Sequence, residues 1–381
     1  MEDRVRIRAA VLREMGTPVR VEQLELAAPR EDEVLVRVAA AGVCHSDLHL
    51  ADGHLGSTRQ PIVLGHEGAG VVEAVGAAVR HVAPGDRVGF CFVPSCGTCP
   101  QCRAGRANLC EPAGVHNGLG VLGDGTTRLS FPDGTPVKHF LSVSCFAERC
   151  IVPAASAIPL PESLPLWQAA LVGCSVVTGL GAVRNAARVQ PGDSVAVIGC
   201  GGVGLQVVSG AHLVGAGIVI AIDRDPDKLR LARDRGATET LRVSETEGDI
   251  VRRVHAVCAG GVDAAIEVVG LPETIRQAFD LIRPGGTAVV VGIAPRGVDV
   301  PLPALDFLGD KTIRGCFYGS GKPAAEMPEL IRMLMDGRID VAGAVSEFTD
   351  LDGIEAAFER LRRGEGVRTV VVVDHDDAGL T

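Results

Sequence analysis

The chain has little of what a nucleic-acid or membrane partner requires. It contains one tryptophan, one tyrosine and 37 lysine and arginine residues against 47 acidic ones, and its net charge is −10. An acidic chain with so few large rings is a poor match for phosphate backbones, stacked bases or anionic lipid. It also has no uninterrupted run of about 18 apolar residues, the length that spans a bilayer. We therefore expect neither nucleic acid nor membrane as a partner.

The start of the chain lacks the pattern of a secretory leader. The charged residues Met1-Glu2-Asp3-Arg4 lead into alternating, strand-like sequence rather than into an apolar core with a cleavage site. We expect a cytoplasmic protein. In that compartment its twelve cysteines indicate metal ligands and buried thiols rather than disulfides.

A length of 381 residues is too great for one ordinary hydrophobic core and predicts two domains. The first part of the chain consists of short alternating segments broken by glycine and proline, which predicts a β-rich domain. Examples of these segments are residues 6–11, 33–38 and 70–75. A cysteine-dense loop at 94–112 and a glycine-rich excursion at 113–145 follow.

The periodicity changes after Pro165. Residues 166–188 read as a helix, and the continuous apolar run at 194–198 is typical of a buried parallel strand. Alternating strands and helices follow, which predicts a doubly wound parallel sheet. Helices near 326–336 and 351–362, a strand at 368–373 and a loose polar tail from Asp374 complete the expected elements.

A glycine-rich loop follows the strand at 194–198. Residues 199–204 fit the pattern G-x-G-x-x-G, open a helix, and precede an acid, Asp223, at the end of the next strand. This context indicates a dinucleotide site in which the pyrophosphate lies on a helix N-terminus. Asp223 would accept hydrogen bonds from the ribose and repel a 2′-phosphate, which favours NAD over NADP, although Arg224 weakens that preference. A glycine-rich turn in an unrelated α/β domain is the alternative.

Four cysteines lie close together in the loop at 94–112. They are Cys96, Cys99, Cys102 and Cys110, with the spacing C-x2-C-x2-C-x7-C. Four nearby thiolates predict a closed, structural zinc site that stabilises the loop and does not catalyse. An iron–sulfur cluster and four free thiols are the alternatives, and the short final spacing favours zinc.

Three further residues suit a second metal ion. Cys44, His66 and Cys174 offer two thiolates and one imidazole, a ligand set that leaves the fourth tetrahedral position of zinc open. They are far apart, since 174 − 44 = 130 residues separate the two cysteines. That they converge on one ion is a hypothesis about the fold.

Taken together, these motifs resemble the zinc-dependent alcohol dehydrogenases of the medium-chain dehydrogenase/reductase superfamily. The resemblance covers nearly the whole chain, and the excursion at 113–145 is similar to the long insert of the dimeric branch. It implies an α/β protein with a GroES-like β-rich catalytic domain at 1–176, a Rossmann domain at 177–319 and a return of 320–381 to the catalytic domain. It also implies a homodimer that uses NAD and holds two zinc ions per subunit.

The resemblance implies roles for single residues. Cys44, His66 and Cys174 match the catalytic zinc ligands. Glu67 matches a nearby acid that approaches the metal, and Asp47 matches the carboxylate that orients His66. Ser46 and His49 match a proton relay. The implied cofactor contacts are His45, Thr178, Gly199, Gly201, Gly202, Val203, Gly204, Asp223, Arg224, Lys228, Val291 and Arg368. The implied substrate pocket is lined by Phe92, Phe140 and Leu141. The remaining histidines receive no assigned role, with an edge of the active-site cleft as the alternative for His54 and His116.

The implied reaction is reversible hydride transfer between a primary alcohol, for which an aromatic or medium-chain type suits the pocket, and NAD. Formaldehyde dehydrogenases of this branch hold glutathione with acids and an arginine. This chain has Leu55, Ser57 and Val115 at those positions, so we do not expect glutathione adducts as substrates. An aldehyde reductase, a formaldehyde dehydrogenase with another thiol carrier, and a non-catalytic dinucleotide-sensing zinc protein are the alternatives.

Overall fold

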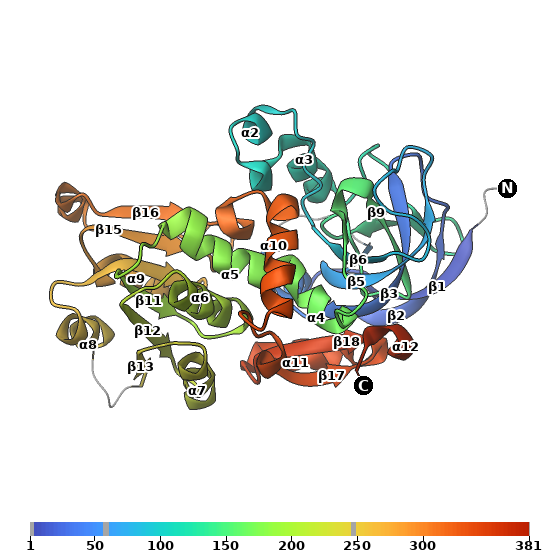
Figure 1. Ribbon diagram of the computed structural model, residues 1–381. Coiled ribbons are helices and arrows are strands. Elements are labelled where there is room, and N and C mark those ends of the chain that lie inside the picture. The colour runs from blue at the N-terminus through green and yellow to red at the C-terminus, as the bar shows by residue number, and fades with distance from the viewer. Residues whose placement is uncertain (1–3, 56–60, 245–248, 381) are drawn as a thin grey trace. The chain divides into compact units, whose positions relative to one another are not determined.

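The computed structural model describes residues 4–55, 61–244 and 249–380 (Figure 1). The chain divides into two compact units. Unit 1 comprises Met1–Cys174, Lys322–Asp336 and Val345–Thr381, and unit 2 comprises Ser175–Gly321 and Gly337–Ala344. The predicted α/β class, a β-rich part and a doubly wound parallel sheet, is confirmed. Within the C-terminal 320–381 segment, Gly337–Ala344 packs with unit 2.

Unit 1 is built from a closed barrel and a second, mostly antiparallel sheet. The barrel order is β1 (Val5–Leu12), β2 (Arg20–Leu26), β7 (Leu129–Ser130), β8 (Pro136–His139) and β4 (Ile62–Val63). The second sheet has the order β10 (Ala157–Pro159), β6 (Arg87–Phe90), β5 (Glu67–Val75), β3 (Glu33–Gly42), β18 (Arg368–Val372) and β17 (Val345–Thr349), with β9 (Arg149–Pro153) on β3. The predicted strand near residue 370 therefore pairs with β3, more than 300 residues earlier, with Val371 opposite Ala41.

The helices of unit 1 are mostly short. They are α1 (His45–Ala51), α2 (Pro100–Arg103), α3 (Glu111–Leu119), α4 (Leu166–Leu171), α10 (Pro323–Met335), α11 (Ile354–Arg363) and α12 (His375–Ala378). The prediction of a loose tail from Asp374 is wrong, because these residues form α12. Asp374 caps this helix by accepting the backbone N–H groups of Asp376 and Asp377, and Arg37 on β3 forms ion pairs with Asp374 and Asp377. These local charges order the polar segment.

Unit 2 contains a six-stranded parallel sheet, counted over the described residues. Its order is β13 (Glu239–Arg242), β12 (Ile218–Asp223), β11 (Ser194–Ile198), β14 (Val262–Glu267), β15 (Ile282–Val290) and β16 (Thr312–Gly315). Its helices are α5 (Val177–Gly181), α6 (Gly202–Leu213), α7 (Pro226–Asp234), α8 (Ile250–Val257) and α9 (Pro272–Leu281). Numbered along the chain, the strand order is 3-2-1-4-5-6, that of a dinucleotide-binding Rossmann sheet. The order reverses between β11 and β14, where such sheets bind their ligand.

One helical stretch, Leu166–Ala187, is long and apolar enough to cross a membrane by length and composition alone. Polar residues interrupt this stretch, so a search of the sequence for an unbroken apolar run does not detect it. Of its most apolar segment, 89% is buried inside the protein, as in a core helix. One π-helical segment interrupts it at Val172–Val176, and a second, Ala182–Ala187, ends it.

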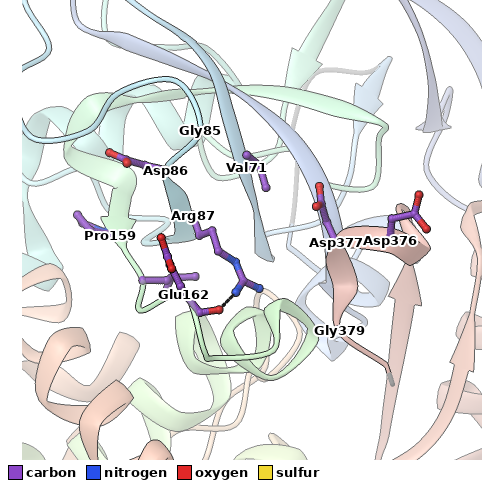
Figure 2. A pocket seen from close by; sticks show the side chains of 10 residues that line it. Val71, Gly85, Asp86, Arg87, Pro159, Glu162, Asp376, Asp377 and Gly379 are labelled. Atoms are coloured by element: carbon purple, nitrogen blue, oxygen red, sulfur yellow. Dashed lines mark hydrogen bonds between the residues drawn. The ribbon is translucent and has the colours of Figure 1, made fainter.

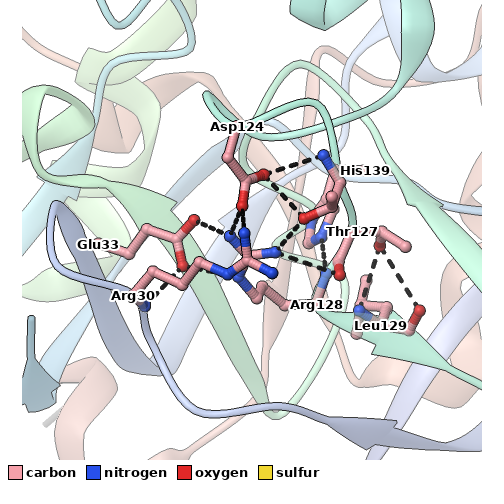
Figure 3. Close-up of polar contacts among 8 residues, drawn as sticks. Arg30, Glu33, Asp124, Thr127, Arg128, Leu129 and His139 are labelled. Carbon is pink, nitrogen blue, oxygen red and sulfur yellow. Dashed lines mark hydrogen bonds and ion pairs between the residues drawn. The ribbon is translucent and has the colours of Figure 1, made fainter.

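A buried arginine ties the excursion at 113–145 to the second sheet (Figure 3). The Arg128 guanidinium donates two hydrogen bonds to the Glu33 carboxylate, at 2.8 and 2.6 Å, and one to Asp124 at 2.7 Å. Its backbone N–H donates to Nε2 of His139 at 3.1 Å. Because both charges are buried and fully paired, removal of either would leave an uncompensated charge in the interior.

Acid is expected to destabilise the protein through His139. Burial, aided by Arg128 and Lys138, lowers the pKa of this imidazole from 6.5 to about 3. Between pH 6.5 and about pH 3, His139 is protonated in the unfolded chain and neutral in the folded chain. The free energy of unfolding is therefore unaffected by His139 above pH 6.5 and decreases as the pH falls below that value. The loss is about 1.4 kcal/mol per pH unit, or about 2 kcal/mol at pH 5. Urea unfolding at about pH 7 and about pH 5 should show a smaller pH effect in His139→Gln; an equal effect would contradict the assignment.

Candidate metal centre and nucleotide site

Four side chains from three separate parts of the sequence meet inside unit 1. Cys44, His66, Glu67 and Cys174 are all buried, and one ligand atom from each lies within 4.8 Å of the others. Cys44 is the N-cap residue of α1, His66 immediately precedes β5, and Cys174 lies in the π-helical turn Val172–Val176. The fold thus brings together the three residues for which the sequence only supported a hypothesis.

Glycines allow this close approach. A Cβ atom at Gly65, where φ is +91°, would lie 2.5 Å from the backbone nitrogen of Phe146. A Cβ atom at Gly173, next to Cys174, would collide with the Phe90 carbonyl oxygen. Real Cβ atoms do not approach backbone so closely, so a side chain at either position would displace a cluster residue.

The orientation of His66 fits a metal ligand. Its Nδ1 lies 3.3 Å from the buried carboxylate of Asp47, which also accepts the Gly65 N–H at 2.8 Å. Its Nε2 is buried and has no hydrogen-bond partner among the described residues. A ring held by a carboxylate at one nitrogen, with the other nitrogen unsatisfied, is the usual state of a metal-binding histidine.

The two thiols are electrostatically unequal. A hydrogen bond from Cys174 holds the pKa of Cys44 well below its usual range, and His66 and Arg368 act in the same direction. The same hydrogen bond, together with burial, raises the pKa of Cys174. The surroundings therefore favour a thiolate at Cys44 more than at Cys174. Two sulfurs and an imidazole with one unsatisfied buried nitrogen fit a zinc ion that retains an open position.

Glu67 forms an ion pair with Arg368, and both side chains are almost fully buried. Burial is the main cause that raises the pKa of Glu67 to about 7, against the attraction of the arginine. The sequence predicts Arg368 as a cofactor contact, and the structure shows its guanidinium engaged with the acid of the metal cluster. A Cβ atom at Gly42 would lie 2.6 Å from Glu67 Oε2 and 2.8 Å from the Arg368 guanidinium, so a side chain there would push against this ion pair.

The four cysteines at 96–110 form a second cluster, with their sulfur atoms within 4.8 Å of one another. The Cys96 sulfur accepts the backbone N–H groups of Thr98 at 3.5 Å and Cys99 at 3.3 Å, and these bonds lower the pKa of Cys96 to about 6. The Cys110 sulfur accepts the Cys96 N–H at 3.3 Å. Backbone donors that stabilise the Cys96 thiolate within a four-sulfur cluster fit a closed zinc site.

Three of the predicted relay and pocket residues contact ligands of the first cluster: Ser46, Phe92 and Phe140. Ser46 Oγ is 3.7 Å from Cys44 Sγ, and His49 lies on the same helix, α1. The rings of Phe92 and Phe140 meet the His66 ring edge to face, with centroids 5.3 and 5.5 Å away. Leu141 is half-buried beside Phe140, and His45 is exposed at the start of α1.

One residue without an assigned role from the sequence lies close to the relay. His54 Nδ1 is 3.2 Å from His49 Nδ1. In the sequence, Gly53 could have indicated this contact, because a glycine just after the seven-residue helix α1 turns the chain back toward the last helical turn. His116 lies on α3 and is half-buried.

The glycine loop of unit 2 is shaped for a phosphate. Gly201 caps α6, and a Cβ atom built there meets nothing within 4 Å among the described residues. Gly199 has φ of +92°, and a Cβ atom at Gly204 would collide with the Gly199 carbonyl oxygen, so helix and strand pack as closely as glycine permits. The open space at Gly201, over the helix N-terminus, fits a pyrophosphate.

Asp223 ends β12, as the sequence predicts. Its carboxylate accepts the backbone N–H groups of Cys200 at 2.7 Å and Asp225 at 2.9 Å, which fixes it beside the glycine loop. The other predicted cofactor residues of this unit are Gly202 and Val203 at the start of α6, exposed Arg224, half-buried Lys228 on α7, Val291 directly after β15 and buried Thr178 on α5. Unit 2 thus holds the expected nucleotide elements.

A surface hollow of about 730 Å³ lies elsewhere in unit 1 (Figure 2). Asp86, Glu162, Asp376 and Asp377 are among its lining residues, and Arg87 donates a hydrogen bond to the Glu162 carbonyl oxygen. None of the predicted site residues lines it.

A three-ligand metal cluster, a four-cysteine cluster and a dinucleotide loop together define a zinc- and nucleotide-dependent dehydrogenase. The family descriptions "Alcohol dehydrogenase GroES-like domain" and "Zinc-binding dehydrogenase" match residues 30–162 and 202–336. The chain belongs to the zinc-containing alcohol dehydrogenase family of the medium-chain dehydrogenase/reductase superfamily. Its two clusters correspond to two zinc sites and its parallel sheet to an NAD(P)-binding domain. Family membership makes it an enzyme and sets aside the non-catalytic alternative.

Three relatives show how far the similarity extends. An S-(hydroxymethyl)glutathione dehydrogenase from Synechocystis sp. is 36% identical over 365 residues, which cover 96% of this chain and 99% of the relative. The structure of benzyl alcohol dehydrogenase from Acinetobacter calcoaceticus is 33% identical, with a TM-score of 0.90 and coverage of 97% and 99%. A zinc-binding dehydrogenase from Sinorhizobium meliloti, solved with NADP, is 31% identical, with a TM-score of 0.79 and coverage of 97% and 99%.

Proposed function

We propose that this enzyme interconverts primary alcohols of aromatic or medium-chain type with their aldehydes, using NAD. The observation that carries the substrate class is the pair of rings, Phe92 and Phe140, that flank the metal-facing histidine His66. Two aromatic walls against the metal cluster favour an apolar group next to the reacting carbon. The relative named benzyl alcohol dehydrogenase, similar over 97% of this chain, supports the same class.

The chain's own residues divide the work. When bound, zinc supplies Lewis-acid polarisation of the substrate oxygen, and the nicotinamide supplies the hydride acceptor. Cys44, His66 and Cys174 hold the metal, and Asp47 keeps Nε2 of His66 turned toward it. Ser46 takes the hydroxyl proton. The proton then moves to His49 and leaves for solvent.

Glu67 and Arg368 lie beside the metal ligands as a buried ion pair. We infer that Glu67 adjusts the charge of the metal cluster. We also infer that the Arg368 guanidinium, which Glu67 holds in place, contacts the bound cofactor. In unit 2, the residues 199–204 hold the pyrophosphate, and Asp223 holds the ribose hydroxyls. The Asp223 carboxylate would repel a 2′-phosphate, which favours NAD over NADP.

A second candidate is a formaldehyde dehydrogenase that uses a thiol carrier, because the 36% identical relative is named S-(hydroxymethyl)glutathione dehydrogenase. The positions expected to hold glutathione argue against that thiol. Leu55 and Val115 are apolar side chains that are 36% and 58% exposed, and they offer no charge to a peptide carboxylate or amine. The third position, Ser57, lies outside the described residues. From the family we also infer a cytoplasmic homodimer.

A kcat/KM screen with NAD and with NADP tests the proposal. We expect benzyl and medium-chain primary alcohols to exceed ethanol and secondary alcohols by about 10- to 200-fold, the range that apolar pocket contacts supply. The same screen should show a preference for NAD and no gain from glutathione with formaldehyde. The highest kcat/KM with S-(hydroxymethyl)glutathione would replace the proposal by the second candidate. A preference for NADP would contradict the role of Asp223.

A further inference from the structure

The helix α1 ends in a backbone motif that fixes the position of His54. Gly53, with φ of +81°, donates its N–H to the Leu50 carbonyl oxygen at 3.0 Å, and His54 donates its N–H to the His49 carbonyl oxygen at 2.8 Å. These two bonds are the Schellman arrangement, which turns the chain back over the last helical turn. The backbone therefore places His54 beside His49.

The two histidines occupy positions where this motif usually carries an apolar contact. Their ring centroids are 5.5 Å apart and their Nδ1 atoms are 3.2 Å apart. Nitrogens at that distance form a hydrogen bond only when one carries the proton and the other offers its lone pair. The pair therefore holds one proton between its Nδ1 atoms, and it leaves Nε2 of each ring for other partners.

The surroundings favour passage of a proton outward. His49 is half-buried, whereas His54 is exposed. Burial lowers the pKa of His49, and His45 and His54 lower it further. Cys44 and Asp52 act in the opposite direction, but the Asp52 carboxylate is bound by Arg362 of α11 at 2.7 Å. A positive charge is thus disfavoured on His49 and is better solvated on His54.

Arg362 is the charged group that reaches this region from the packed helix α11. It also pairs with Glu355 at 3.2 Å and Glu359 at 2.6 Å, both on its own helix. These acids neutralise the arginine and do not replace His54 as the contact partner of His49. The exposed His45 ring lies farther away, with its centroid 6.2 Å from that of His49, so the histidine pair gives a proton on His49 its closest contact with an exposed ring.

We propose that His54 is a positioning residue that carries the released proton from His49 to solvent, an inference that rests on the proposed dehydrogenase function. A proton that arrives at Nε2 of His49 makes that ring an imidazolium. Its Nδ1 proton passes to Nδ1 of His54, which then releases its own Nε2 proton to water. Each ring ends as its other neutral tautomer, and proton exchange with water restores both before the next turnover.

His54→Asn tests this step, because its amide can accept a hydrogen bond from His49 but cannot carry the proton. We expect kcat for alcohol oxidation near pH 6 in dilute buffer to fall about tenfold, below the ~10²-fold of a residue that takes the proton directly. KM should be unchanged, and concentrated imidazole buffer should restore kcat. The matched control is His375→Asn, an exposed histidine on α12 that should behave as wild type. Wild-type pH dependence and buffer dependence in His54→Asn would overturn the proposal.

A second measurement separates this proposal from the choice of substrate. Nitrogen-15 NMR of the zinc-loaded enzyme should show a hydrogen bond between the Nδ1 atoms of His49 and His54, and His54→Asn should remove that signal. The signal without any alcohol turnover would refute the proposed function and leave the histidine pair in place. Absence of the signal in the wild type would refute the pair itself.

Discussion

Cys174→Ser is expected to abolish turnover while NADH binding persists. Serine keeps the volume of the side chain but replaces a soft thiolate by a hydroxyl, a poor zinc ligand in this buried cluster. Loss of the metal removes Lewis-acid stabilisation worth several kcal/mol, so we expect kcat to fall by at least about 10³-fold. Metal analysis should find one zinc per chain in place of two. Titration of NADH fluorescence should give a Kd close to that of the wild type.

The control for this variant is Cys150→Ala. Cys150 is also buried, on β9, but belongs to neither sulfur cluster. It should keep both zinc ions and most of its activity. Unchanged activity in Cys174→Ser, or two retained zinc ions, would remove Cys174 from the metal site.

Cys99→Ser is expected to separate stability from catalysis. A four-sulfur zinc site contributes its binding free energy directly to folding, about 10–16 kcal/mol in isolated zinc peptides. Loss of only several kcal/mol of this binding free energy would already destabilise the fold. At roughly 2–4 °C per kcal/mol, the melting temperature would fall by about 10 °C. The variant should lose one zinc, unfold earlier in calorimetry and still turn over at low temperature.

The same variant distinguishes the two clusters. Zinc that remains after Cys99→Ser should be bound by Cys44, His66 and Cys174, so kcat at about 15 °C should stay within a few-fold of the wild type. If Cys99→Ser lost all activity and kept the melting temperature of the wild type, the four-cysteine cluster would be the catalytic site and the other cluster the structural one. Iron in place of zinc in the purified protein would restore the iron–sulfur alternative.

Local patterns predicted the strand, loop and helix of the proposed nucleotide site. The residues that matter, from Gly199 to Gly204 and Asp223, lie on adjacent elements of one strand–helix–strand unit. Their positions follow from the sequence once the strands are recognised. The strand at 368–372 was equally visible from its run of valines. Its pairing with β3 depends on a contact across most of the chain.

The metal cluster was predictable in composition and not in geometry. The side chains of Cys44, His66 and Cys174 converge because Gly65 and Gly173 allow backbone segments to pack closely. Local sequence patterns do not predict how closely two distant backbone segments approach. The helix α3 was missed because Gly114 and Gly118 lower its propensity, although Pro112 and Gly120 mark its ends. The tail helix α12 depends on Arg37, which lies far away in the sequence.

Diffraction data collected at the zinc absorption edge test the central claim most directly. We predict two anomalous peaks per chain: one within the sulfurs of Cys96, Cys99, Cys102 and Cys110, and one about 2.3 Å from the Cys44 and Cys174 sulfurs and about 2.0 Å from His66 Nε2. A second peak that touches fewer than these three side chains, or a single peak at the four-cysteine cluster in an active preparation, would contradict the account.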